Sequence, residues 1–148
     1  MTDPGLVQHF FPAARRPRIA RAEGIWFVTE DGQRLMDASS GPVVSNLGHG
    51  NARVLAALER QARDAAFAFP MQFESDANAE LGTLLSQLAG PGFERAFLCS
   101  GGSEAVETAI KFARQHAVVA GQTQRWKVIA RDPGYHGNTL GALAISGD

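Results

Sequence analysis

The stretch FLCSGGSEAVETAIKFAR, which runs from Phe97 to Arg114, decides how this 148-residue sequence is interpreted. Its first residues belong to a short apolar run, 95–99, whose length is typical of a buried strand. Two adjacent glycines follow, and apolar residues then recur every three or four positions, which predicts a helix over 103–120. Gly121 is expected to end that helix. A strand, a glycine turn and a helix in this order form a building unit of α/β proteins.

The flanking segments extend this alternation of strands and helices. Residues 126–130 predict another strand, and helices are predicted over 52–66 and 76–89. Nearer the N-terminus, Ile25–Val28 and Arg34–Met36 flank an Asp-Gly dipeptide and predict a β-hairpin. We therefore expect an α/β fold with a largely parallel sheet flanked by helices. The residues expected to face inward from the three helices are Val54, Leu55, Leu58, Ala62 and Ala65, then Ala77, Leu81, Leu84, Leu85 and Leu88, and then Val106, Ala109, Ile110, Ala113 and Ala117.

Composition argues against several classes of protein. The net charge is -1 and no sizeable basic tract is present, so nucleic acid and anionic membrane are poor candidates for a main partner. No apolar stretch approaches the length of about 18 residues that a membrane span needs. Cys99 is the only cysteine, which fits a reducing compartment, and we expect a cytoplasmic protein. No pair among the four histidines has the spacing of helical metal ligands, so no metal site is expected.

The glycine turn before residues 103–120 has the outline of a phosphate site. The first amides of a helix lack partners inside it, and that end of the helix is partly positive, so phosphate binds there readily. Gly101 and Gly102 allow the backbone to approach an anion, and Ser103 adds a hydroxyl. From the residues alone, two other interpretations stay open. One is a helix start that merely uses small polar residues, and the other is a nucleophile elbow, because Gly101-x-Ser103-x-Ala105 nearly matches Gly-x-Ser-x-Gly.

A second loop, DPGYHGNT at 132–139, follows the predicted strand 126–130. Ligands of open α/β sheets bind beyond the carboxyl ends of strands, so this loop and the glycine turn are expected at the same edge. Tyr135, the only tyrosine, offers an aromatic plate, and His136 offers a base, a stacking ring or a hydrogen-bond donor. The alternative is that both rings are structural. An anion site beside an aromatic plate predicts a flat, phosphorylated ligand.

Four stretches together resemble the class III (ω-type, ornithine/GABA-like) aminotransferases, which use pyridoxal phosphate and have fold type I. They are GIWFVTEDGQRLMDASSG, SNLGHGNARVLAALERQ, FLCSGGSEAVETAIKFAR and PGYHGNTLGALAISG, in the order of the family, and they cover most of residues 22–147. The resemblance implies that residues 1–45 belong to the small domain. Residues 46–148 would be the first part of the large domain, which binds pyridoxal phosphate. The implied activity is transfer of an amino group from an amine or amino acid to a keto acid, by a homodimer.

The resemblance also implies roles for particular residues. Gly102 and Ser103 match the Gly-Ser/Thr pair whose amides and hydroxyl bind the cofactor phosphate, and Gly101 shapes the turn before them. Tyr135 matches the aromatic residue that stacks on the pyridine ring. His136, the less certain contact, follows it in the aromatic-His-Gly pattern.

A third region is implied to form the substrate pocket. Gly41–Asn46 matches a loop that lines this pocket, and Val43 stands where some amine-accepting members carry a large aromatic residue. Phe69–Phe73 is expected to border the pocket, from the same subunit or from its neighbour.

One departure from the family pattern concerns the chemistry itself. The reaction needs a lysine amine that forms a Schiff base with the cofactor, and an acidic residue beside the ring nitrogen. The chain has two lysines, Lys111 and Lys127, and neither matches the catalytic lysine of the family. The acidic partner is also missing. We therefore assign no catalytic residue and expect a segment of a longer enzyme that is inactive by itself.

Two rival functions remain. The first is an α/β hydrolase with Ser103 as nucleophile, for which His136 with Asp132 or Asp148 would have to complete the triad. The second is a non-catalytic, truncated domain that binds a phosphate compound or a partner chain.

Overall fold

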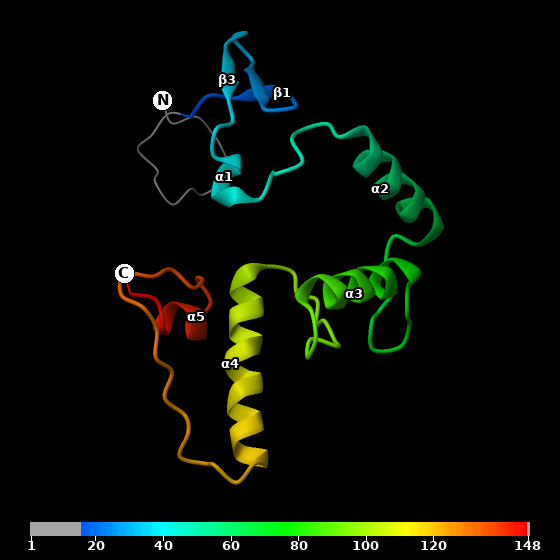
Figure 1. The fold of residues 1–148 in the computed structure, drawn as a ribbon. Helices are drawn as coiled ribbons and strands as arrows, with labels where there is room; N and C mark the ends of the chain where they lie inside the picture. The colour runs from blue at the N-terminus through cyan, green and yellow to red at the C-terminus, as the bar shows by residue number, and fades with distance from the viewer. Residues whose placement is uncertain (1–15, 148) are drawn as a thin grey trace. The chain divides into compact units, whose positions relative to one another are not determined.

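The computed structural model describes residues 16–147, and its ribbon is drawn in Figure 1. The chain divides into two compact units, Met1–Phe73 and Glu74–Asp148. The first unit holds strands β1 (Ile19–Glu23), β2 (Trp26–Thr29) and β3 (Arg34–Met36) and helices α1 (Ser40–Val43) and α2 (Ala52–Ala65). The second unit holds helices α3 (Asp76–Ala89), α4 (Gly102–Val119) and α5 (Leu140–Ala144). No helix of the described part of the chain is long and apolar enough to cross a membrane.

The three strands of the first unit form one antiparallel sheet in the order β1-β2-β3. The predicted hairpin is confirmed as β2 and β3, and Gly32 in its turn has φ 83°, a conformation that glycine adopts without steric cost. The turn is held by Thr29, which is buried and whose hydroxyl accepts a hydrogen bond from the Gln33 amide at 2.9 Å. Strand β1 was not predicted, because its sequence, IARAE, lacks an apolar alternation.

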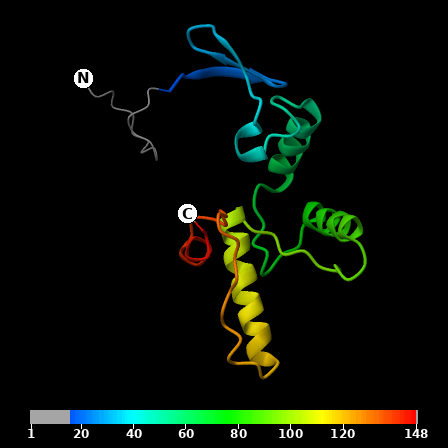
Figure 2. The same cartoon turned by 60° about the vertical axis from the view of Figure 1, so that its left-hand side comes forward.

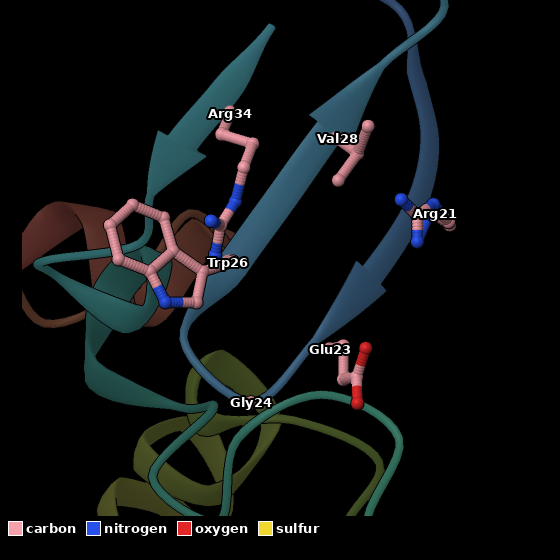
Figure 3. Close-up of a pocket in the computed structure, with 6 residues that line it drawn as sticks. All are labelled: Arg21, Glu23, Gly24, Trp26, Val28 and Arg34. Atoms are coloured by element: carbon pink, nitrogen blue, oxygen red, sulfur yellow. The ribbon is translucent and has the colours of Figure 1, made fainter. Parts of the chain in front are cut away.

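One face of this sheet carries a hollow of about 540 Å³, drawn in Figure 3. The strand register places Arg21, Val28 and Arg34 directly across from one another on three adjacent strands. The guanidinium of Arg34 lies 4.5 Å from the ring centroid of Trp26, which is a cation–π distance. None of the residues predicted to bind the cofactor lines this hollow.

Helices α2 and α3 begin and end where local signals place them. Asn51 caps α2 by accepting hydrogen bonds from the amides of Arg53 and Val54. Ser75 caps α3 in the same way through the Asn78 amide, and Gly90, with φ 87°, follows its last residue. The bounds predicted for α3 are therefore confirmed, and those for α2 differ by one residue.

The prediction that the apolar stripes of these helices face inward is wrong for the residues that the structure describes. Leu55 and Leu58 of α2 and Leu84 of α3 each expose half of their surface or more, and neither helix has a buried residue. Within the part of the chain described, the buried apolar side chains are Ala117 of α4 and Ala142 of α5. The physical reason is that an apolar stripe is covered only by a partner element, and none of those described covers these stripes.

In the second unit, α5 packs against α4. Figures 1 and 2 both show α5 beside the N-terminal part of α4, and the chain between them runs back along the helix. Helix α4 confirms the predicted 103–120 helix with a shift of one residue at each end. Gly121, with φ 74°, follows it as expected.

The two strands predicted for this unit, 95–99 and 126–130, are not formed. Neither segment pairs with another strand, and the only sheet of the described residues is antiparallel rather than parallel. Their side chains are exposed, with Phe97 at 78% and Ile129 at 97% of full accessibility. A strand exists through hydrogen bonds to a neighbour, and these two segments do not pair with each other.

Candidate functional site at the start of helix α4

The start of α4 is open, as a phosphate site requires. Gly101 is the N-cap residue, with an extended backbone, and no side chain caps the first amides of the helix. A Cβ added at Gly102 would meet nothing within 4 Å, and one at Gly101 would meet only the end of the Glu104 side chain. The amides of Gly102 and Ser103 have no partner inside the helix, because they belong to its first turn. This end of the helix can therefore receive an anion.

The loop that carries Tyr135 is bonded to this first turn. The Ser103 hydroxyl donates to the side-chain oxygen Oδ1 of Asn138 and accepts from the backbone N–H of Asn138, both at 3.1 Å. Gly137 is buried against the same residue, and a Cβ added there would lie 2.8 Å from Ser103 Oγ and 2.9 Å from Ser103 Cα. The structure thus brings together two sequence motifs that are more than 30 residues apart. It also shows that the Ser103 hydroxyl is turned toward the loop.

The two rings of the loop are in different surroundings. Tyr135 is 67% exposed, so its ring has surface free for a flat ligand. The backbone amide of His136 donates to Ser146 Oγ at 3.0 Å, and Ser146 Oγ in turn donates to the Ala142 carbonyl. His136 Nε2 is buried and has no hydrogen-bond partner among the described residues. An orphaned polar atom of this kind is consistent with a missing ligand.

These features fit a phosphorylated aromatic cofactor. The open helix start offers amides to a phosphate, the exposed ring of Tyr135 offers a stacking surface, and both belong to one hydrogen-bonded unit. Glu104, in the first turn of α4, is the only acidic side chain that this turn brings to the helix start.

Glu107 is a residue of this region whose position the sequence did not indicate. Its spacing to Lys111, four residues along the helix, is that of an i,i+4 ion pair, but no salt bridge joins the two within the described part of the chain. Instead its Oε2 accepts hydrogen bonds from the Thr139 hydroxyl at 2.8 Å and from the amides of Gly141 and Ala142 at 3.0 and 3.2 Å. The bond from Thr139, those from the two amides and the charge of Lys111 together hold the pKa of Glu107 below its ordinary value.

The predicted substrate residue Val43 lies in the first unit. It is 72% exposed and has φ 62°, which is unusual for a β-branched residue and marks a strained turn. The loop that contains it is closed at its base by a bond of 3.1 Å between Asp37 Oδ2 and His49 Nε2. His49 also exchanges two backbone hydrogen bonds with Gly24.

The turn at 69–73, which was also expected to border the substrate pocket, is closed by its own backbone: the amides of Gln72 and Phe73 donate to the Phe69 carbonyl.

The hydrolase alternative finds no support in this arrangement. Ser103 is bonded to an asparagine, and no bond joins its hydroxyl to His136, whose Nε2 is unpartnered. Asp148, one of the two acids considered for a triad, lies outside the described residues. A serine nucleophile needs a base within hydrogen-bond reach, and residues 16–147 place none beside Ser103.

Comparison with known proteins identifies the family of the chain. The class-III aminotransferase family matches residues 12–148. An uncharacterised aminotransferase of Schizosaccharomyces pombe is 42% identical over 136 residues, which cover 92% of this chain and 30% of that protein. The chain therefore spans about a third of the length of such relatives.

Two solved structures share the fold. An (S)-enantioselective omega-transaminase from Thermomicrobium roseum has a TM-score of 0.86 at 32% identity, over 95% of this chain and 34% of that one. A taurine:2-oxoglutarate aminotransferase from Bifidobacterium kashiwanohense, solved in complex with PLP and glutamate, has a TM-score of 0.86 at 34% identity, over 97% of this chain and 31% of that one. These likenesses confirm the expected fold class. The family match extends over nearly the whole sequence, and the chain belongs to the class-III aminotransferases.

Proposed function

We propose that the complete protein is a transaminase that uses pyridoxal phosphate to move an amino group from an amine or amino acid to a keto acid. The observation that carries this proposal is the contact between Ser103 and the Asn138 segment, which joins an open helix start to the loop of an exposed tyrosine. Family membership and the PLP-bound relative support the choice of cofactor.

In this proposal the described residues bind and orient the cofactor. The amides of Gly102 and Ser103 hold the phosphate at the start of α4, and Gly101 adds no side chain of its own beside the end of the Glu104 side chain. Tyr135 lies against the ring and fixes its plane. His136, whose buried Nε2 has no hydrogen-bond partner among the described residues, is assigned a contact with a polar atom of the ligand. When bound, the cofactor supplies an aldehyde that takes up the amino group and a ring that accepts electrons.

The proton transfers belong to residues that this sequence does not contain. Lys111 is exposed and lies eight residues after Ser103, about 12 Å along the axis of α4, and Lys127 has its ammonium 5.8 Å from the Trp126 ring, so neither amine is placed at the start of α4. We propose that the catalytic lysine and the acid beside the ring nitrogen come from the remainder of the complete protein. The division into a small domain, 1–45, and a large domain, 46–148, remains part of the proposal.

We further propose a homodimer in the cytoplasm, in which Val43 and the turn at 69–73 border the substrate pocket. The support is the resemblance to the family for the dimer and the pocket, and the single cysteine for the compartment. The strained backbone of Val43 also favours a functional turn.

The experiment compares Ser103→Ala with Ser75→Ala in the complete protein. The Ser103 hydroxyl donates to Asn138 Oδ1 and accepts from the Asn138 backbone amide, so removing it takes away both bonds that anchor the Asn138 segment. At about 0.5–1.5 kcal/mol for each bond, we expect cofactor binding to weaken by about 1–3 kcal/mol. Ser75→Ala removes a helix cap of α3 and serves as the control that leaves cofactor affinity unchanged. Equal affinity of the Ser103→Ala variant and the unmodified protein would refute the role of the Ser103–Asn138 contact in cofactor binding. A complete protein with neither cofactor absorbance nor amino transfer would favour the non-catalytic alternative.

A further inference from the structure

We infer that Glu107 is a positioning residue for the proposed cofactor site: it fixes residues 137–142 against α4 and thereby sets where Tyr135 lies relative to the start of that helix. The inference rests on the proposed function. Glu107 is not expected to touch the cofactor, since the described contacts of its carboxylate are with the loop and α5.

A single oxygen of Glu107 gathers three donors from one short segment. They are the Thr139 hydroxyl and the amides of Gly141 and Ala142, at distances between 2.8 and 3.2 Å. The two amides belong to the first turn of α5, where Thr139 occupies the N-cap position without capping the helix through its own side chain. Glu107 therefore caps α5 from a neighbouring helix, in place of a local cap.

This cap matters more than usual because α5 is short. It contains five residues, Leu140–Ala144, and a helix of that length is not stable by itself. Its buried contact with the rest of the unit is made by Ala142, which is fully buried. Without the carboxylate, the amides of Gly141 and Ala142 would lose these partners.

A second attachment of the loop lies on the same face of α4 as Glu107. Glu107 follows Ser103 by four residues, so the two side chains lie one above the other, about 6 Å apart along the helix axis. Ser103 holds Asn138, Glu107 holds residues 139–142, and Gly137 is buried between the loop and the helix. Tyr135 is only two residues before Gly137. Its position relative to the helix start therefore depends on both attachments.

Gly141 shows how closely the carboxylate fits. A Cβ added at this residue would lie 2.7 Å from each oxygen of Glu107, closer than any stable contact. The segment can lie this near α4 only because residue 141 has no side chain.

The experiment uses the complete protein and three variants: Glu107→Ala, Glu107→Gln and Thr139→Val. Glu107→Ala removes the acceptor of all three bonds, whereas Glu107→Gln keeps an amide oxygen that can accept from the same donors. Thr139→Val removes the bond to Glu107, together with the 3.5 Å contact of the same hydroxyl with the Ser103 carbonyl, and it changes the shape little, so it reports on the attachment even if Glu107→Ala does not fold. Ser75→Ala, which removes the cap of α3, is the matched control.

Three measurements are made on each variant. They are the dissociation constant for pyridoxal phosphate, the visible circular dichroism of the bound cofactor at saturation, and hydrogen exchange of residues 134–147 in the cofactor-free protein. For Glu107→Ala we expect faster exchange of this segment, weaker dichroism and a dissociation constant raised about tenfold or more, as when the supporting partner of a ligand-binding group is removed. Thr139→Val should change all three measurements in the same direction but by less. Glu107→Gln should stay much closer to the unmodified protein than Glu107→Ala does. Ser75→Ala should change none of the three measurements.

The inference is overturned if Glu107→Ala or Thr139→Val exchanges faster in this segment while its cofactor affinity and dichroism stay those of the unmodified protein. In that case Glu107 is structural and the proposed function is untouched. If the unmodified protein does not bind pyridoxal phosphate, the proposed function fails and the inference fails with it.

Discussion

Substituting Gly137 by alanine tests the contact between the Tyr135 loop and α4. Gly137 is buried and has φ 135°, a backbone conformation that side chains rarely permit. The added methyl carbon would lie 2.8 Å from Ser103 Oγ and 2.9 Å from both Ser103 Cα and Ala142 Cβ. Helix α4 contributes two of these atoms and α5 the third, so the methyl group would push against both sides of the contact.

The expected destabilisation of the segment by Gly137→Ala follows from these distances. Carbon atoms are in favourable contact at about 3.5–4.0 Å, so the methyl group at 2.9 Å from Ala142 Cβ is too close by about 0.6 Å. Overpacking of this kind costs about 1–3 kcal/mol, and an alanine at an unsuitable φ adds about 1 kcal/mol. We expect a total of about 2–4 kcal/mol, which raises the opening equilibrium of the segment roughly 30- to 700-fold.

Hydrogen exchange of residues 134–147 in the complete protein measures this opening, and titration with pyridoxal phosphate measures its effect on the site. Gly82→Ala is the matched control, because a Cβ there meets nothing within 4 Å and Gly82 lies inside α3. It should stabilise α3 by about 1 kcal/mol and leave residues 134–147 unchanged. The reasoning is refuted if Gly137→Ala exchanges and binds the cofactor like the unmodified protein.

Two further predictions concern charged groups. The pKa of Glu107 is held below its ordinary value mainly by the bond from the Thr139 hydroxyl, and also by the α5 amides and Lys111. The ionised Glu107 carboxylate therefore stabilises the folded state fully above about pH 4.3. This stabilisation is lost as the pH falls further, through the pKa of Glu107 in the folded state. Thermal unfolding of Glu107→Gln and of the unmodified protein should therefore differ at pH 7 and converge in acid; a difference that does not change with pH would contradict this. Asp37→Ala removes the 3.1 Å bond to His49 that closes the base of the Val43 loop, and it should speed exchange and limited proteolysis within residues 38–48. Unchanged rates would show that the bond does not hold the loop.

Helix boundaries could be predicted because they depend on local chemistry. Asn51 and Ser75 carry oxygens that cap the next residues, and Gly90 adopts a positive φ that ends α3. The tight turn of the hairpin was predicted for the same reason, from its Asp-Gly dipeptide. Each of these features involves residues a few positions apart, so a single sequence contains the necessary information.

Whether residues 95–99 and 126–130 form strands could not be predicted from local chemistry. Their apolar residues are suitable for a buried strand, but pairing depends on a neighbour that the local sequence does not specify. Without a neighbouring strand, Phe97 and Ile129 remain exposed. The prediction that the apolar stripes of α2 and α3 face inward was wrong for the same reason. The sequence pattern predicts which side of a helix is apolar, but it does not specify the element that covers that side.

The candidate site was predicted in its parts. The glycines before α4 and the ring of Tyr135 stand out because few residue types allow an open turn or an aromatic surface. The bonds that join these parts, from Asn138 to Ser103 and from Thr139 to Glu107, link residues more than 30 positions apart. The available signal for Glu107 was its position one turn after Ser103 on the same helix face, which becomes meaningful only once the loop is known to lie there.

The most direct test of the account is a crystal structure of the complete protein with pyridoxal phosphate bound. We expect phosphate oxygens at about 2.7–3.2 Å from the amide nitrogens of Gly102 and Ser103, with the ring against Tyr135 and the Asn138 segment still bonded to α4. A phosphate held elsewhere, or a Tyr135 ring without contact to the cofactor, would contradict it.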